Sequence, residues 1–226
     1  KSRYFDEHEH EIPWDYIEFM HSAMKAMGGS SLAPKENGNG KDAEKEKRPP
    51  IGYQLIAAQL EALSWGDVGM YHCLPGGGLG AAAVHSAGTA DQRVKFLSRF
   101  NGDKPTFAAM CITEAGAGSD NSAIRTRAVL DEKTNEWVIN GEKIFVTGGD
   151  KSFTEYEKLG RGFIVVWASI DPSAKRAGMR AFVVEGGTKG GEVVKLEKKM
   201  GIRVSDTAAI SLVDARVPFE NILGSP

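Results

Sequence analysis

The spacing of apolar residues changes at Pro105, and this change constrains the fold more than any other feature of the chain. Before it, apolar residues recur at helical intervals, as Met20 and Met24 do. After it, short apolar runs alternate with turn residues, which is typical of strands. We therefore expect an α+β fold, with an N-terminal helical domain over residues 1–105 and an antiparallel β-sandwich or barrel domain over residues 106–226.

The helical region should hold several helices joined by turns. We expect one after Pro13 that Gly28 ends, one from Ile51, a buried one within residues 68–88, and one after Thr89. Thr89 and Gln92 have capping-box spacing, and the helix that follows should direct Val94, Leu97 and Phe100 inward. Residues 33–50, rich in charge, Asn and Gly, should form an exposed loop.

The second half should be built of strands. We expect a β-hairpin within Trp137–Val146, because Asn140-Gly141 supplies the positive φ angles of a type I′ turn. Further strands are predicted over Phe163–Ser169, Ala181–Glu185, Val193–Lys198 and Ala208–Val213.

One strand, Phe107–Ile112, runs directly into the glycine-rich turn Thr113–Asp120. Such a turn offers backbone N–H groups and the Ser119 hydroxyl to an anionic or polar group that approaches the backbone. The Trp137–Thr147 segment ends in an aromatic residue and a threonine. The two segments together suggest a cofactor site on the β-domain.

Several other classes of function find no support in the composition. A net charge of −2 gives no footprint for nucleic acid, and no apolar run is long enough to span a membrane. Two cysteines without CxxC or Cys/His spacing predict neither a disulfide framework nor a zinc site. Gly76–Ala81 satisfies G-x-G-x-x-A, but helical surroundings favour close helix packing over a dinucleotide fold. His8 and His10 lie in a charged N-terminal segment, which we interpret as exposed and not as a metal site.

Five segments together resemble one enzyme family. Cys111–Ala123 is similar to the flavin-site motif of the acyl-CoA dehydrogenases, and Asn140–Gly149 resembles the second flavin segment of that family. Gly88–Gln92 resembles the end of the family's helical domain, while Met200–Thr207 and Val217–Gly224 resemble the end of its middle domain. Because the segments occur in family order, the resemblance is very specific. It implies the acyl-CoA dehydrogenase fold without its C-terminal four-helix bundle.

The resemblance assigns the first segment to an FAD site. Met110, Ile112 and Thr113 would contact the pyrimidine side of the flavin. Gly118 and Ser119 would face the pyrophosphate, and Ser119 would also lie near the thioester arm of the acyl-CoA substrate.

The second segment would cover the flavin ring. Phe145, at a position where many members have Trp, would stack on the isoalloxazine, Val146 would line the cofactor site, and Thr147 would sit beside N5. Glu114 belongs to the turn motif, and we expect it to accept backbone hydrogen bonds.

The implied activity is FAD-dependent α,β-dehydrogenation of an acyl-CoA to a trans-2-enoyl-CoA, with electron-transfer flavoprotein as acceptor. The full-length enzyme would be a homodimer or homotetramer, in the bacterial cytoplasm or the mitochondrial matrix. The family's catalytic Glu lies in the C-terminal helical domain, so no residue here is assigned as the base. We interpret the sequence as a fragment that is itself inactive.

Two alternatives remain open. One is an acyl-CoA or nitroalkane oxidase on the same scaffold, which rapid reoxidation of the reduced flavin by air would favour. The other is a non-catalytic subunit of a heteromeric dehydrogenase, which a colourless protein that cannot be reconstituted with FAD would favour.

Overall fold

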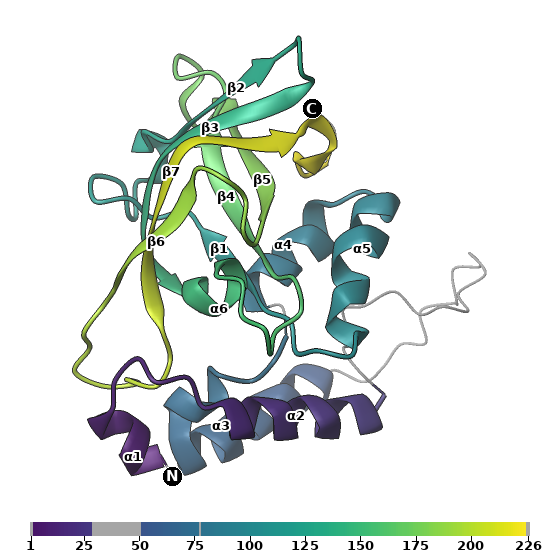
Figure 1. The fold of residues 1–226 in the computed structure, drawn as a ribbon, viewed down its shortest axis with the longest axis vertical. Coiled ribbons are helices and arrows are strands. Elements are labelled where there is room, and N and C mark those ends of the chain that lie inside the picture. The colour runs from purple at the N-terminus through teal and green to yellow at the C-terminus, as the bar shows by residue number, and fades with distance from the viewer. Residues whose placement is uncertain (1, 29–50, 77, 225–226) are drawn as a thin grey trace.

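The computed structural model describes residues 2–28, 51–76 and 78–224, so the predicted loop over residues 33–50 lies outside it. The first helices of the chain form one end of the molecule and a curled sheet forms the other (Figure 1). The described helices are α1 (Ser2–Glu7), α2 (Trp14–Ala26), α3 (Ile51–Tyr71), α4 (Gly78–Ala87), α5 (Ala90–Leu97) and α6 (Gly149–Phe153).

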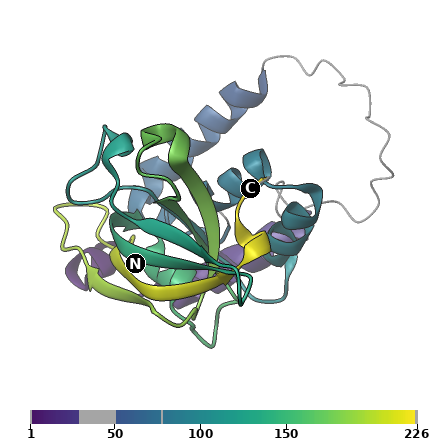
Figure 2. The same ribbon diagram turned by 90° about the horizontal axis from the view of Figure 1, so that it is seen from above.

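The strands form a single seven-stranded sheet. They are β1 (Ala108–Cys111), β2 (Arg127–Asp131), β3 (Glu136–Thr147), β4 (Phe163–Ser169), β5 (Met179–Glu185), β6 (Gly191–Leu196) and β7 (Thr207–Pro218). Their order is β1-β4-β2-β3-β7-β6, and β5 pairs with β4. Seen from above, β2, β3 and β7 lie across β4 and β5, so the sheet curls around its own inner face (Figure 2). The predicted α+β class is confirmed, although β4 pairs in parallel with both β1 and β2.

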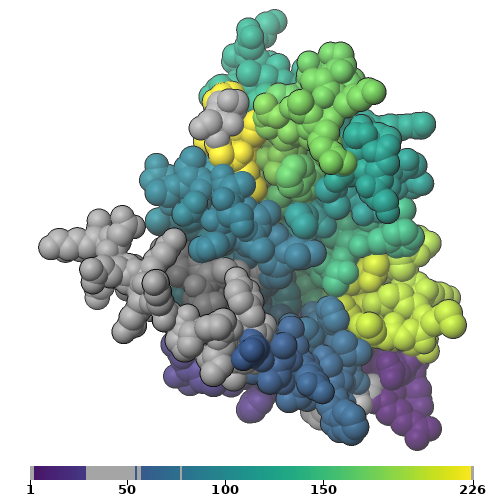
Figure 3. Space-filling model, turned by 180° about the vertical axis from the view of Figure 1, so that it is seen from behind, coloured from purple at the N-terminus to yellow at the C-terminus, as the bar shows by residue number. Residues whose placement is uncertain are grey.

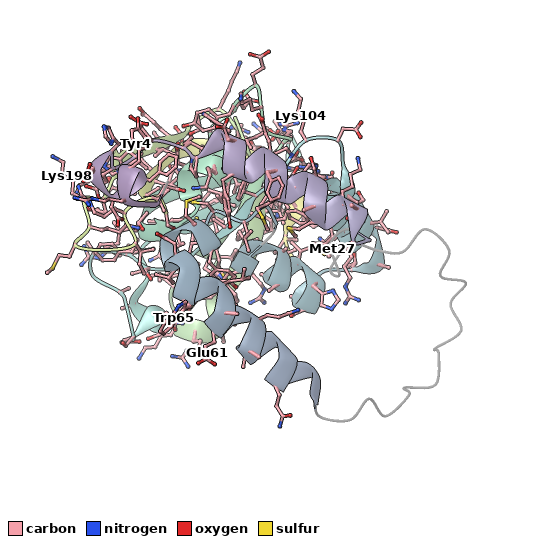
Figure 4. The ribbon with its side chains drawn as sticks, turned by 90° about the horizontal axis from the view of Figure 1, so that it is seen from below. Tyr4, Met27, Glu61, Trp65, Lys104 and Lys198 are labelled. Atoms are coloured by element: carbon pink, nitrogen blue, oxygen red, sulfur yellow. The ribbon has the colours of Figure 1, made fainter. Side chains whose placement is uncertain are left out.

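Two predictions for the helical region need correction. Residues 68–88 do not form one helix, because α3 ends at Tyr71 and α4 begins at Gly78. Helix α3 is also kinked at Asp67, whose extended backbone (φ −170°) lets its carboxylate accept a hydrogen bond from the Met70 N–H at 2.8 Å. This side-chain acceptor starts a new helical turn within α3. Near the kink, Glu61 and Trp65 point away from the body of the molecule (Figure 4), and Trp65 is 92% exposed.

Helix α5 has the predicted capping box but a different buried face. The Thr89 hydroxyl accepts a hydrogen bond from the Gln92 N–H, and the Gln92 side chain accepts one from the Thr89 N–H. Leu97 and Phe100 are buried as predicted, whereas Val94 is 56% exposed and Phe96 is buried. The buried residues Gln92, Phe96 and Phe100 follow one another at intervals of four, which is ordinary α-helical spacing, and Val94 lies off this face.

The predicted hairpin at Asn140-Gly141 is wrong. These residues lie inside β3, which runs unbroken from Glu136 to Thr147 and shifts register against β7 between Ile139 and Gly141. The glycine is there for a close approach: a Cβ at Gly141 would lie 2.4 Å from the Thr126 hydroxyl oxygen. The actual turn, between β2 and β3, contains Asn135 at φ 55°.

Of the apolar clusters among the described residues, the two largest lie inside the sheet and against it. One fills the inside of the curled sheet and includes Ile139, Ile164 and Ile210. The other joins α4 and α5 to the sheet, with Phe96 of α5 packed beside Phe163 of β4 at a ring-centroid distance of 5.5 Å. From behind, α4 and α5 occupy the middle of the molecule, between the strands and the lower helices (Figure 3). In α4, a Cβ at Gly80 would lie 2.7 Å from the Ala108 carbonyl carbon, so the glycine-rich motif serves close packing on β1 as predicted.

Candidate functional site

The two segments singled out from the sequence lie side by side. The residues after β1 meet β3 where the Ile144 N–H donates to the Thr113 carbonyl at 2.9 Å. One residue earlier, the Lys143 ammonium donates to the Ile112 carbonyl at 3.0 Å. A ligand placed against one segment therefore faces the other as well.

An aromatic side chain stands out from this junction. Phe145 is 60% exposed and has φ 58°, which is uncommon for a bulky residue. The cause is a β-bulge. From Lys143 to Val146, β3 advances by three residues, whereas its partner β7 advances by only two, from Ile210 to Ala208. Bulges re-aim side chains, and this one turns a phenyl ring to solvent. Positive φ at such a residue costs of the order of 1–3 kcal/mol and is typical of functional sites.

The predicted site residues differ in how accessible they are. Thr147 is exposed like Phe145, and Met110, Ile112 and Thr113 are half-buried along the end of β1. Val146 is only 2% exposed and packs in the core inside the sheet, so its backbone alone could contact a ligand. The alternation of Trp137, Ile139 and Lys143 along β3 would have placed Val146 on the outer side, and the bulge before Val146 reverses this.

Gly118 and Ser119 lie on an exposed turn that begins at Glu114. Glu114 and Ala117 exchange two backbone hydrogen bonds, of 3.0 and 3.1 Å, which close a tight turn around Ala115 and Gly116. Nothing lies within 4 Å of where a Cβ of Gly118 would be, so this stretch of backbone is open to an approaching group.

A buried ion pair underlies the junction. The Lys143 ammonium lies 2.7 Å from the Glu114 carboxylate, with Lys143 fully buried and Glu114 9% exposed. Glu114 also accepts hydrogen bonds from the N–H groups of Arg125 (2.6 Å) and Thr126 (3.0 Å) and from the Thr126 hydroxyl (2.6 Å). The expectation that Glu114 accepts backbone hydrogen bonds is thus confirmed.

The surroundings of this pair act on both of its pKa values. Burial alone would raise the pKa of Glu114, but the hydrogen bonds from Lys143, Thr126 and Arg125 outweigh it and lower that pKa. Burial also lowers the pKa of Lys143, against the opposing effect of Glu114. Glu114 is therefore a carboxylate held in its charged form, which suits an anchor better than a proton acceptor.

Sequence reasoning missed Lys143, although a signal was present. It follows Glu142 in a charged pair typical of a surface. Yet it shares its odd position along β3 with Trp137 and Ile139, both of which are buried. The alternation of a strand therefore places Lys143 on the core side.

A second buried ion pair lies shortly after the exposed residues Phe145 and Thr147. Lys151 of α6 contacts the Asp206 carboxylate, and both side chains are buried. The same carboxylate accepts a hydrogen bond from the Asp150 N–H at 2.9 Å, and the Asp206 carbonyl accepts one from the Gly148 N–H at 3.0 Å. The residues directly after Thr147 are thereby fastened to the loop before β7.

The arrangement offers a stacking ring, two threonine hydroxyls and an open glycine turn, which suit a flat, polar cofactor that carries a phosphate group. Within the described ranges, no three His, Cys, Asp or Glu side chains gather in a way that could hold a metal ion. None of the helices in those ranges is long and apolar enough to cross a membrane.

Comparisons with known proteins agree with this geometry. Residues 109–215 match the family model described as the middle domain of acyl-CoA dehydrogenase. A curated relative from Caenorhabditis briggsae, a probable medium-chain specific acyl-CoA dehydrogenase, is 36% identical over 225 residues, covering 98% of this chain and 49% of the relative. An acryloyl-CoA reductase (NADH) from Anaerotignum propionicum is 40% identical over 144 residues, which is 63% of this chain and 34% of that protein.

A solved structure is similar along almost the whole chain. The butyryl-CoA dehydrogenase of Megasphaera elsdenii superposes with a TM-score of 0.73 at 27% identity, covering 99% of this chain and 54% of that one. The chain thus spans about half the length of the Caenorhabditis briggsae and Megasphaera elsdenii proteins. Its sequence, its fold and its two adjoining segments place it in one family: the chain belongs to the acyl-CoA dehydrogenases.

Proposed function

We propose that these residues form half of the FAD site of an enzyme that dehydrogenates acyl-CoA thioesters between the α and β carbons, giving a trans-2-enoyl-CoA. The observation that carries the proposal is the exposed Phe145 ring, held at positive φ where β3 meets the end of β1. Strain at an exposed aromatic residue is hard to explain by stability alone. The family's activity supplies a use for it.

The chemistry of these residues suits FAD. Phe145 would stack on the isoalloxazine ring, and the hydroxyls of Thr113 and Thr147 would donate to its polar edge. The open backbone at Gly118 and Ser119 would receive the pyrophosphate. Bound FAD would supply the two-electron redox chemistry of the reaction.

The protein groups in this half would orient the reactants. Ser119 would position the thioester arm, and Met110 and Ile112 would exclude water from one side of the cofactor. Glu114 is fully engaged by Lys143, Thr126 and Arg125 and is not the base that takes the α-proton. We assign no catalytic base among these residues.

For the whole protein we propose an acyl-CoA substrate, electron-transfer flavoprotein as electron acceptor and a homodimeric or homotetrameric assembly. Its place would be the bacterial cytoplasm or the mitochondrial matrix. We further propose that the helical residues 1–105 and the strand-rich residues 106–226 correspond to two domains of the enzyme, and that the 226 residues alone do not turn over.

The test uses the natural polypeptide that contains these residues. It should bind FAD, and anaerobic addition of acyl-CoA thioesters should bleach the flavin absorbance. A Phe145→Ala variant should bind FAD more weakly, whereas Val129→Ala, at another exposed apolar position, should not. A colourless protein that cannot be reconstituted with FAD would contradict the proposal, and rapid reoxidation by air would indicate an oxidase instead.

A further inference from the structure

We propose that Glu114 and Lys143 are positioning residues that set the alignment of the two site segments, and so the pose of the Phe145 ring. The inference rests on the proposed function for its consequence, but its geometry stands by itself. Neither side chain reaches the exposed face of the site, since both are buried beneath it. Their effect would pass through the backbone that they hold.

The pair connects three stretches of chain at one point. Lys143 on β3 donates both to the Glu114 carboxylate (2.7 Å) and to the Ile112 carbonyl (3.0 Å). Glu114 in turn binds the Arg125 and Thr126 N–H groups in the segment before β2. One ammonium and one carboxylate therefore fix the end of β1, the glycine turn and β3 relative to one another.

The pair also lies at the position where alignment matters most. Lys143 is the last residue of β3 in regular register with β7 before the bulge that exposes Phe145. The next residue, Ile144, donates its N–H to Thr113 rather than to β7. Without the bond from Lys143 to Ile112, the adjacent hydrogen bond from Ile144 to Thr113 would be weakened. The strained backbone of Phe145 would then relax toward the conformation of an ordinary strand.

A purely structural role would not require charge. Apolar side chains of similar volume often stabilise a core as well as a buried ion pair does, whereas an ion pair with directed hydrogen bonds specifies one alignment. The packing around the pair is also tight, because a Cβ at Gly141 would lie 2.4 Å from the Thr126 hydroxyl oxygen, which donates to Glu114 at 2.6 Å.

The experiment compares Lys143→Met, Glu114→Gln and the double variant with Val184→Ala. Val184 is a buried residue of β5, which pairs with β4 and not with the strand that carries Lys143. Thr126→Val serves as a milder variant should the charge deletions fail to fold, since it removes one hydroxyl from Glu114. The first readout needs no cofactor: amide hydrogen exchange at Ile144, relative to Val165 in β4. The second is FAD affinity and the visible spectrum of the bound flavin.

Lys143→Met and Glu114→Gln should each speed exchange at Ile144 by about tenfold or more relative to Val165 and weaken FAD binding to a similar degree. The double variant should regain much of the thermal stability, because no buried charge is left unpaired, yet FAD binding should stay weak and the flavin spectrum shifted. Val184→Ala should speed exchange at both amides alike and leave FAD affinity within about twofold.

The outcomes separate the inference from the proposed function. If the charge variants speed exchange at Ile144 and at Val165 by the same factor, as expected for Val184→Ala, the positioning role is wrong. It is also wrong if FAD affinity recovers in step with stability in the double variant. If the unaltered protein binds no FAD, the proposed function fails, and the exchange measurement still decides whether the pair aligns the segments.

Discussion

At the scale of single residues, the site is defined by side chains and backbones in unfavourable places. Phe145 exposes a ring at a backbone angle that suits glycine, and Lys143 places an ammonium where apolar side chains belong. Each departs from the local rule for its position. Such departures are expected to coincide with functional sites, where the demands of binding override local preferences.

The angle at Phe145 predicts a conflict between stability and binding. Phe145→Gly should stabilise the fold by about 1 kcal/mol or leave it unchanged, because glycine adopts φ 58° without strain although it gains entropy when unfolded. The same change should weaken FAD binding, since the stacking ring is gone. Lys175→Gly, at another exposed residue with positive φ (50°), is the matched control for stability alone. Urea unfolding and FAD titration of both variants check this, and loss of stability only in Phe145→Gly would contradict it.

The lowered pKa of Glu114 predicts a specific loss of stability in acid. Because its folded-state pKa lies below the ordinary value of 4.5, Glu114 stabilises the fold fully above pH 4.5, and this contribution disappears as the pH falls through the folded-state pKa. Glu114→Gln should therefore lower the free energy of unfolding at pH 7 and flatten its dependence on pH below 4.5. Urea unfolding at a series of pH values measures both, and equal acid slopes in the two proteins would contradict the assignment.

At the scale of elements, sequence patterns predicted most of the strands and the capping box but not the shape of β3. Asn140-Gly141 is the usual signal for a tight turn, yet the strand continues through it because Gly141 is needed against Thr126. Strand β2 was not predicted, because only three consecutive apolar residues, 128 to 130, mark it in the sequence. The place of Phe145 could not be read from local sequence either, since the bulge depends on pairing with β7, more than sixty residues away.

Helix α5 joins the helical region to the end of β7 through Gln92. Its side chain donates to the carbonyls of Glu220 and Ile222 and accepts from the N–H groups of Thr89 and Gly224. Thr89→Ala removes one cap and should cost about 1 kcal/mol of stability. Gln92→Ala leaves several buried backbone groups unpaired and should cost about 2–3 kcal/mol. Urea denaturation of the two variants checks the order, and an equal loss would show that the links to residues 220–224 contribute nothing.

At the scale of the whole molecule, the change of apolar spacing at Pro105 marks a sharp boundary in the sequence, but the hydrophobic core extends across it. The cluster that joins α4 and α5 to the sheet places Phe96 and Leu97 against Phe163 and Val165. Helical and strand regions thus share buried surface, and the site belongs to the same sheet on which these helices pack. Destabilising α4 or α5 should therefore also destabilise the site.

Helix α5 provides a matched pair of residues to test this coupling. Phe96 is fully buried and Val94 is 56% exposed, two positions apart on the same helix. Phe96→Ala should destabilise the protein by about 3–5 kcal/mol, whereas Val94→Ala should change stability by less than about 0.5 kcal/mol. The reporter in the sheet is Cys111, which is fully buried, with a thiol pKa raised by burial to about 12, so that it reacts with alkylating reagents only when β1 opens. In Phe96→Ala the alkylation of Cys111 and the loss of helical circular dichroism should shift to lower urea together, because one core spans both regions. Separate transitions, with Cys111 still protected after the helices have unfolded, would mean that the sheet and its site are stable without the helical layer.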